Sequence, residues 1–361
     1  MSADDLGRPE VRRRLETYLA EEALPDWSGV EIQDLRRATG GLSWETFFLS
    51  VAERDAPERR ARLALKRAPE RGPLEPYDIR KEASLLAALP AGGVPVPRVL
   101  AWTRDPSVIG REFSVMEFVE GENPDLRKIE DWEEWNDEAA RGELADQVLG
   151  ALTALHRFDW RRADLPAVVG EPGTGAERLA RSVDHYQGKI ERYVIPRWPA
   201  QPMVRHAGLW LKQNAPDLPE DELVIVHGDF RFGNWMWRGR RLAAVMDWER
   251  ASLGDPMQDL GFLCMPLARQ RRPELMGMLV PLDDLAARYE SRGDREFDRR
   301  RLHFYVIYWQ FVEAALVPRG LAYAAEDRTQ LRSITAYPQL NINTRQLAEL
   351  IDDYEAGRHV L

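Results

Sequence analysis

Two acidic side chains and one amide in the middle of the sequence have the types and the spacing for chemistry on a phosphate. The stretch HGDFRFGN, residues 227–234, places Asp229 and Asn234 five positions apart, and Asp247 follows after a further strand-like segment. An aspartate can accept a proton from an attacking hydroxyl, and an asparagine oxygen and a second carboxylate are hard ligands of the kind that Mg²⁺ binds. Phosphoryl transfer needs this combination, because its catalysis consists of positioning the nucleophile and neutralising phosphate charge. We therefore predict Asp229 as the catalytic base or orienter, and Asn234 and Asp247 as ligands of Mg²⁺.

The same stretch also fits a polar turn in which the Asp and Asn side chains bond to the nearby backbone. Two neighbouring features favour the functional interpretation. The apolar run LVIV (223–226) predicts a strand directly before the motif, and a carboxylate ends the segment after it.

The first 120 residues read as five strands interrupted by one helix. An N-terminal helix is expected over 8–22, strands over 31–38, 44–53, 62–68, 95–103 and 111–119, a helix over 78–90, and a turn over 104–110. The strands are short runs bounded by Gly, Pro and polar turns, whereas the helices carry apolar positions three and four apart. A doubly wound sheet would alternate strands with helices, so the order indicates an α+β protein.

Beyond residue 124 the pattern becomes mainly helical. Helical spacing covers 143–158 and 177–194, and the apolar segment 304–317 reads as a buried helix; the only later strand signals are LVIV, WMWR and LAAVMDW. We predict two lobes with a hinge near 117–123. The N-lobe, residues 1–120, would hold the sheet and the nucleotide, and the helical C-lobe, 121–361, the catalytic loop, the metal site and the acceptor pocket.

Composition limits the class of protein. The chain has 361 residues, 44% hydrophobic and 30% charged, with a net charge of −10. These values describe a soluble globular protein rather than a disordered one, and the acidic balance argues against a nucleic-acid partner. The segment 304–317 carries Gln310 and Glu313 and is too short to span a bilayer, and the N-terminus has no apolar stretch typical of a signal peptide. The single cysteine, Cys264, lies in an apolar run, so we expect an inert buried thiol in a cytoplasmic protein.

The motif resembles a known family once its neighbours are included. HGDFRFGN matches the kinase catalytic-loop pattern H-x-D-x-x-x-x-N, and MDWE (246–249) occupies the place of the metal-binding D-F-G. The Gly after His227, the Trp-Glu after Asp247 and the stretch LGDPMQDLGFL (253–263) look like the aminoglycoside phosphotransferase family of small-molecule kinases. PVPRVLAWTRDPSVIGREFSVMEFVEG is similar to the branch related to the kinase-like domain of some acyl-CoA dehydrogenases. The resemblance implies a protein-kinase-like fold, a nucleotide donor and Mg²⁺.

That resemblance implies further parts in the N-lobe. Lys66 stands on the third strand, where it would contact the phosphates, and Glu82 on the following helix would hold it. Met116 would lie at the back of the base pocket, with the carbonyl of Glu117 and the amide of Val119 facing the base. The loop ATGGLSWETF has no G-x-G-x-x-G pattern, but its Gly40 and Gly41 allow a close turn, and Ser43 could donate to phosphate oxygens.

Four polar residues around the catalytic loop receive supporting roles or stay open. His227 is expected to brace the loop by hydrogen bonding. Asp255 and Asp259 are expected to cap a helix and brace the loop rather than bind metal. Arg231 would touch either the γ-phosphate or a neighbouring carboxylate.

The acceptor is the least determined part. The C-lobe is rich in aromatic side chains, most of them expected to be core: Trp132, Trp135, Tyr186, Tyr193, Trp198, Trp210, Tyr305, Tyr308 and Trp309. A polycationic aminoglycoside would need a dense acidic pocket, and the only acidic run in that region is 129–138. We therefore expect a hydroxylated, partly apolar or acyl-type small molecule, with an antibiotic or a nucleotide-binding pseudokinase scaffold as alternatives. The sequence does not choose between ATP and GTP as donor, nor does it give the oligomeric state.

Overall fold

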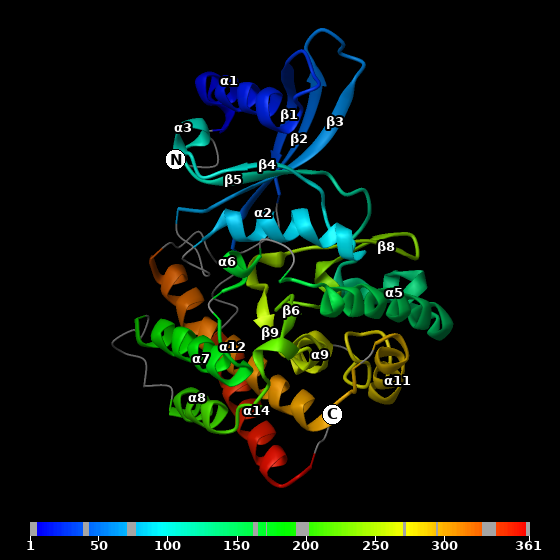
Figure 1. Cartoon of the computed structure of the whole chain (residues 1–361), viewed down its shortest axis with the longest axis vertical. Coiled ribbons are helices and arrows are strands. Elements are labelled where there is room, and N and C mark those ends of the chain that lie inside the picture. The colour runs from blue at the N-terminus through cyan, green and yellow to red at the C-terminus, as the bar shows by residue number, and fades with distance from the viewer. Residues whose placement is uncertain are drawn as a thin grey trace. The chain divides into compact units, whose positions relative to one another are not determined.

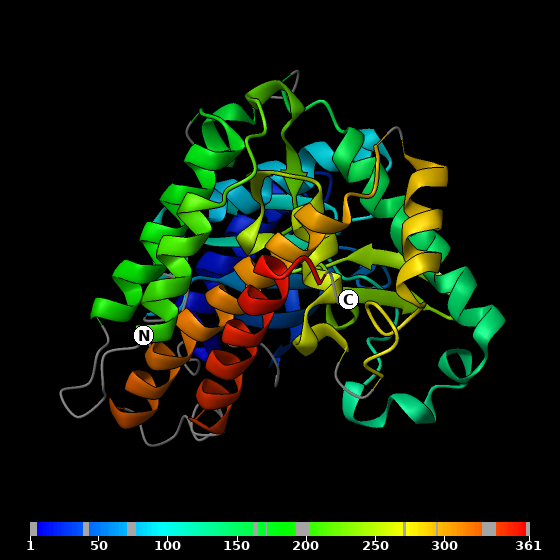
Figure 2. The ribbon, with the colours of Figure 1, turned by 90° about the horizontal axis from the view of Figure 1, so that it is seen from below.

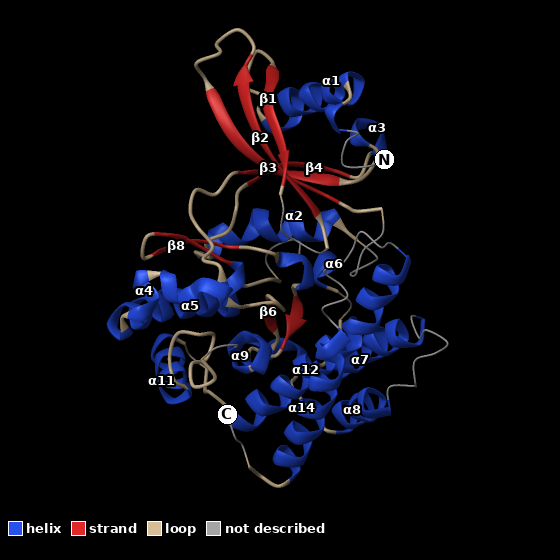
Figure 3. Ribbon diagram, turned by 180° about the vertical axis from the view of Figure 1, so that it is seen from behind, coloured by secondary structure: helices blue, strands red, loops and turns tan. Residues whose placement is uncertain are grey.

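The computed structural model describes residues 6–38, 43–70, 77–161, 165–170, 172–192, 202–269, 272–293, 295–326 and 337–358. The chain forms two compact units. The first comprises Met1–Glu122, Met236–Gly239 and Ala243–Glu249, and the second comprises Asn123–Trp235, Arg240–Leu242 and Arg250–Leu361. The large sheet belongs to the first unit and most helices to the second (Figure 3).

The first unit is built on an antiparallel five-stranded sheet (Figure 1). Its elements are α1 (Pro9–Tyr18) with the π-turn Leu19–Ala23, β1 (Val30–Arg37), β2 (Glu45–Glu53), β3 (Arg60–Arg67), α2 (Ile79–Ala88) with the 3-10 turn Leu89–Gly92, β4 (Val99–Thr103), α3 (Pro106–Ile109) and β5 (Phe113–Glu117). The strand order is β1-β2-β3-β5-β4. The five predicted strands and the predicted helix α2 are confirmed, whereas the short helix α3 between β4 and β5 was not predicted.

One expected turn is a short helix. The segment 104–110 was predicted as a turn, but α3 forms there because Asp105 caps its N-terminus by accepting from the Ser107 amide, and Pro106 occupies the first helical position. Gly110 ends the helix in the left-handed conformation, with φ of 83°. The Pro and Gly signals that suggested a turn are also those that begin and end a helix of one turn.

The two faces of this sheet carry different side chains, apolar on one and polar on the other. Phe47, Leu49 and Leu65 are buried on one face in a core that includes Val11 and Leu15 of α1. Each such side chain contributes about 1.5–3 kcal/mol when it is fully buried. Because side chains alternate along a strand, the other face carries the cross-strand row of Thr46, Lys66 and Ser114.

The second unit is mainly helical. Its elements are the 3-10 turn Leu126–Asp131, α4 (Glu133–Asn136), α5 (Glu138–Arg157), α6 (Pro166–Val169), α7 (Gly175–Arg192), α8 (Pro202–Gln213), β6 (Val224–Val226), β9 (Ser252–Gly254), α9 (Met257–Cys264), α10 (Pro266–Arg269), α11 (Leu282–Arg292), α12 (Arg299–Glu326) and α14 (Tyr337–Glu355). Helix α12 runs beside α14, and α7 and α8 pack along the same group (Figure 2). The hairpin of β7 (Trp235–Arg238) and β8 (Arg241–Val245) is divided between the two units.

The expected β segments after residue 124 were incomplete. Besides the three predicted segments, β9 pairs antiparallel with β6, with Leu253 opposite Ile225. A strand of three residues is too short to show a period of two, so no local pattern predicts β9.

Helix α12 contains the predicted buried segment. Phe304, Val306 and Phe311 are buried, and the indole of Trp309 donates to the carbonyl of Gln258 at 2.6 Å. Most of the C-lobe aromatics named above are core, as expected: Trp132, Trp135, Trp210, Tyr305, Tyr308 and Trp309 are buried. Tyr186 is partly exposed, and Tyr193 and Trp198 lie outside the described residues. Cys264 is buried, as predicted.

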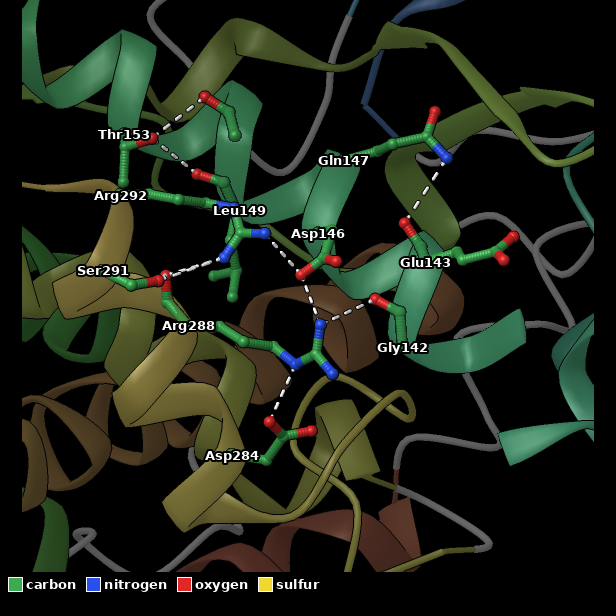
Figure 4. A network of polar contacts seen from close by, with 11 residues as sticks. Gly142, Glu143, Asp146, Gln147, Leu149, Thr153, Asp284, Arg288, Ser291 and Arg292 are labelled. Atoms are coloured by element: carbon green, nitrogen blue, oxygen red, sulfur yellow. Dashed lines mark hydrogen bonds and ion pairs between the residues drawn. The ribbon is translucent and has the colours of Figure 1, made fainter. Parts of the chain in front are cut away.

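A polar network ties α5 to α11 (Figure 4). Asp146 of α5 accepts from the guanidinium groups of Arg288 and Arg292, and Arg288 also donates to Asp284 on its own helix at 2.8 Å. Among the described helices, none is both long enough and apolar enough to cross a membrane.

Candidate active site

A buried ion pair occupies the centre of the first unit. The Nζ of Lys66 on β3 lies 2.7 Å from Oε1 of Glu82 on α2, and both residues are buried. Burial opposes the charge on Lys66, but Glu82, Asp247 and Glu249 outweigh it and raise the Lys66 pKa above its usual range. Lys66 is therefore a fixed cation.

Asp247 joins this cation from a later part of the chain. Its Oδ1 lies 3.3 Å from Nζ of Lys66, and its side chain is 35% exposed. The segment is held by a hydrogen bond of 2.8 Å from the Val245 amide to the carbonyl of Pro95. Asp247 has φ of 68°, in the left-handed region that only small polar residues and glycine enter readily. The backbone is thus bent at this residue.

A second carboxylate, Glu249, lies near the same cation. The hydroxyl of Ser43 donates to both carboxylate oxygens of Glu249, at 2.7 Å each. Burial and the charge of Asp247 raise the pKa of Glu249 to about 8, with Lys66 acting in the opposite direction. Nζ of Lys66 lies over the ring of Trp44, 5.2 Å from the ring centroid. Ser43, predicted to bind phosphate, has a carboxylate as its partner here, and Gly41 lies outside the described residues.

Strand β5 leads to the predicted hinge and is paired through Glu117, which lies opposite Leu63 of β3. Met116 is buried opposite Ala64 of β3. The Glu117 amide donates to the carbonyl of Arg98 at 2.9 Å, and its exposed carboxylate pairs with the same arginine at 2.8 Å. Val119 lies past the last strand pair, and its amide donates to no backbone carbonyl of the described residues.

In the second unit, the loop of residues 227–234 holds Asp229 between two donors. Oδ1 of Asp229 accepts from Nε of Arg231 at 2.9 Å, and Oδ2 accepts from Nδ2 of Asn234 at 2.8 Å. Nδ2 of Asn234 also donates to the backbone carbonyl of Asp229 at 2.8 Å. The open question about Arg231 is thus answered for this structure, since its partner is a carboxylate. The Asn234 amide turns its nitrogen to Asp229 and leaves its oxygen for another ligand.

The loop is braced from beneath by buried polar groups. Nδ1 of His227 accepts from the Asp229 amide at 3.1 Å, so His227 is a brace, as expected. Asp259 accepts from the amides of His227 at 2.8 Å and Gly228 at 2.9 Å. Gly228 has φ of 77°, and a Cβ there would lie 2.7 Å from the carbonyl oxygen of Arg250. Only glycine fits this position.

Asp255 also has the supporting role predicted for it. Its carboxylate accepts from the Met257 amide at 2.8 Å at the start of α9. Nε and Nη2 of Arg301 both donate to it, at 2.9 and 2.5 Å. Protein donors therefore contact both oxygens of this carboxylate.

Each unit contains one predicted metal ligand whose oxygen is of the kind that Mg²⁺ binds. Asp247 offers carboxylate oxygens that are partly exposed, and Asn234 offers an amide oxygen not used in the loop. Within the described parts of the chain, no group of three or more His, Cys, Asp or Glu side chains forms a metal cluster. Mg²⁺ commonly relies on one or two protein ligands together with substrate phosphates, so a sparse set is consistent with it.

Sequence reasoning gave no role to two residues beside the predicted ones. Glu249 was visible as the last letter of MDWE, two positions after Asp247, and this spacing could have marked it. Arg250, the next residue, contacts the loop through tertiary packing, which no local pattern reveals.

The sequence matches a known family over most of its length. The model of the phosphotransferase enzyme family (APH) matches residues 34–305. Acyl-CoA dehydrogenase family member 11 of Mus musculus is 31% identical over 260 residues, which are 70% of this chain and 31% of that protein. The chain thus spans about a third of the length of this relative. The predicted likeness to the kinase-like domain of such proteins is confirmed.

Solved structures with the same fold include small-molecule kinases. A candidate aminoglycoside phosphotransferase from Ralstonia eutropha has a TM-score of 0.69 at 22% identity, covering 94% of this chain and 98% of its own. A mutant of the aminoglycoside phosphotransferase APH(4)-Ia, in complex with ADP and hygromycin B, has a TM-score of 0.54 at 15% identity, covering 92% and 98%. The complex of APH(2")-IIIa with GDP and kanamycin has a TM-score of 0.58 at 15% identity, and the match covers 93% of this chain and 98% of that one.

These likenesses confirm the predicted α+β, protein-kinase-like fold. The family model extends from β1 in the first unit into α12 in the second, across the catalytic loop and Asp247. The chain belongs to the phosphotransferase enzyme family.

Proposed function

We propose that this protein transfers the γ-phosphate of ATP to a hydroxyl of a small molecule. The observation that carries the proposal is the Lys66 cluster, in which a buried lysine is held by Glu82 at 2.7 Å and approached by Asp247 at 3.3 Å. A permanently charged lysine between two carboxylates is suited to a nucleotide phosphate, because phosphoryl transfer depends on neutralising phosphate charge.

Each residue then has a defined task. Lys66 donates to the phosphates of the nucleotide while Glu82 keeps it oriented. Asp229 accepts the proton of the acceptor hydroxyl as the oxygen attacks, and its contacts with Arg231 and Asn234 fix the direction of its carboxylate. Asn234 and Asp247 would hold Mg²⁺, which when bound neutralises the charge of the transferred phosphate.

The nucleotide base would bind along the end of β5. Met116 would close the back of the pocket, and the carbonyl of Glu117 and the amide of Val119 would bond to the base. Gly41 and Ser43 would serve the phosphates, which requires the Ser43 hydroxyl to exchange Glu249 for a phosphate oxygen. Similar folds bind ADP in one case and GDP in another, so either donor fits, and we propose ATP.

For the acceptor we propose a hydroxylated, partly apolar or acyl-type compound. The relative of 31% identity is named an acyl-CoA dehydrogenase family member, which favours an acyl-type acceptor. An antibiotic is the second candidate, because two proteins of similar fold are bound to hygromycin B and kanamycin.

The test is consumption of ATP in the presence of Mg²⁺ against a panel of hydroxyacyl thioesters, hydroxy acids, amino alcohols, sugars, macrolides and aminoglycosides. Stimulation by one class, lost in Asp229→Asn, supports the proposal and identifies the acceptor chemistry. ATP binding without stimulation by any class would favour a nucleotide-binding scaffold. A preference for GTP over ATP would correct the donor alone.

A further inference from the structure

Arg250 is a largely buried cation beside the loop 227–234, and the proposed chemistry gives it no role. It ends the 3-10 turn Trp248–Arg250 and belongs to the second unit. Its side chain is 11% exposed. The space next to Gly228 is filled by Arg250, whose Cβ lies 3.1 Å from the position that a Cβ on Gly228 would take. Arg250 is therefore packed against the residue that precedes Asp229.

Among the described residues, one corner of the Arg250 guanidinium has a protein acceptor. Nη1 donates to Oε1 of Glu313 on α12 at 3.1 Å. Nε and Nη2 are buried, and neither has a hydrogen-bond partner in the described part of the chain. The ring of Trp309 lies 4.8 Å from Cζ and that of Phe262 lies 5.7 Å from it, so aromatic rings contact the group without accepting its hydrogens in the plane. Buried charged donors are rarely left without an acceptor.

The two donors without a partner form the edge of arginine that recognises carboxylates. Nε–H and one Nη2–H point the same way and match the two oxygens of a carboxylate. The same chain shows this edge in use, since Nε and Nη2 of Arg301 both donate to Asp255, at 2.9 and 2.5 Å. Arg250 presents the same edge with no carboxylate of the described residues opposite it.

The surroundings keep Arg250 charged and provide a polar, aromatic neighbourhood. Burial opposes its charge, but Tyr186, Glu313 and Asp229 outweigh burial and raise its pKa. Tyr308 belongs to the same group, because Tyr186 and Arg250 both act on its pKa, which burial raises. The hydroxyl of Tyr308 bonds to that of Ser182 at 2.7 Å.

We propose that the Nε–Nη2 edge of Arg250 binds an oxyanion of the acceptor, so that the acceptor is a hydroxylated acid. This inference rests on the proposed phosphotransfer. Arg250 anchors the acid group while Asp229, next to Gly228 in the loop, receives the hydroxyl. A polycation such as an aminoglycoside would meet a buried positive charge at this position and is disfavoured.

An oxyanion could also come from the nucleotide. We assign it to the acceptor because the groups that act on Arg250 lie on α7, α12 and the catalytic loop, all in the second unit. The residues proposed for the phosphates, Lys66 and Ser43, belong to the first unit. The two sources are separated by measuring acceptor and nucleotide binding in the same variant.

The experiment is calorimetric binding to the full-length chain, with short- and medium-chain hydroxycarboxylic acids as probes and their primary amides as uncharged partners. The wild type should bind the best acid about 10- to 100-fold more tightly than its amide, the range expected for charge-assisted hydrogen bonds. Arg250→Gln should bind acid and amide equally, and Arg250→Lys should retain part of the preference. Arg288→Gln, which alters only the α5–α11 network (Figure 4), should behave as the wild type.

Three results would overturn the assignment. One is a wild type that binds no acid more tightly than its amide. Another is an Arg250→Gln protein that keeps the preference, and the third is an Arg250→Gln protein that loses affinity for ATP rather than for the acid. If Arg250→Gln does not fold, Arg250→Lys and the acid–amide comparison on the wild type decide the matter. A preference for acids without any phosphate transfer would refute the proposed function and leave the anion site standing.

Discussion

The Nζ of Lys66 lies 2.7 Å from Oε1 of Glu82, and these two side chains are 9% and 6% exposed. A buried charge is stable only when it is paired, and here the carboxylates outweigh burial and raise the Lys66 pKa. The pair forms between β3 and α2 within one unit, so protein contacts alone orient the lysine.

Glu82→Gln should weaken both stability and turnover, because it leaves the buried Lys66 without its nearest counter-charge. We expect a loss of about 3 kcal/mol in the free energy of unfolding, and a fall in kcat/KM for ATP of about 100-fold. Urea unfolding and steady-state ATP consumption measure the two effects. Glu120→Gln, which removes an exposed partner of Arg62, should change stability by less than about 1 kcal/mol. Equal stability of Glu82→Gln and the wild type would argue against a structural ion pair.

Gly228→Ala should be much more damaging than Gly239→Ala. Both glycines have positive φ, 77° and 54°, but a Cβ at Gly228 would collide with the backbone of Arg250, whereas nothing lies within 4 Å at Gly239. The free energy of unfolding of the Gly239 variant should fall by about 1–2 kcal/mol from backbone strain alone. The Gly228 variant should lose more than this and also its activity, since the loop carrying Asp229 must move. Thermal unfolding and ATP turnover of the two proteins give the comparison, and equal losses would contradict it.

Asp259→Asn should impair the catalytic loop without touching the nucleotide. Both oxygens of Asp259 accept backbone amides of the loop, and an asparagine would turn a donor towards one of them. The expected cost is about 1–3 kcal/mol in unfolding free energy, with a lower kcat and an unchanged KM for ATP. Asp283→Asn, at an exposed site paired with Arg299, is the control. A change confined to the KM for ATP would show that Asp259 does not act through the loop.

Some contacts of the candidate site were predicted from the sequence, and others could not be. The resemblance to the kinase-like family implied that Glu82 would hold Lys66, and the structure brings the two side chains together. The fixed offsets in HGDFRFGN likewise predicted that Asp229 and Asn234 share one turn.

The remaining contacts depend on residues far apart in sequence. Ser43 was predicted to bind phosphate, yet its partner Glu249 is 206 positions away. The strand β9 is too short for a periodic signal, and the open edge of Arg250 depends on which side chains surround it in space. Local patterns contain none of this information.

Cys264 should make stability depend on alkaline pH. Burial raises the pKa of the thiol from 9.0 to about 12. An unfolded chain loses this proton near pH 9 and the folded chain only near pH 12, so stability is lost as pH rises through that interval, by about 1.4 kcal/mol per unit. Cys264→Ala should remove this part of the slope in urea unfolding measured at several pH values. Identical slopes, or rapid alkylation of the native thiol, would show that Cys264 is not buried.

The proposed phosphate transfer is tested most directly with γ-³²P-labelled ATP and the panel of hydroxylated small molecules, comparing the wild type with Asp229→Asn and Asp247→Asn. We expect a labelled acceptor from the wild type and a loss of transfer of at least about 100-fold in each variant. Transfer that persists undiminished in Asp229→Asn, or Mg-dependent turnover retained by Asp247→Asn, would contradict the proposed roles.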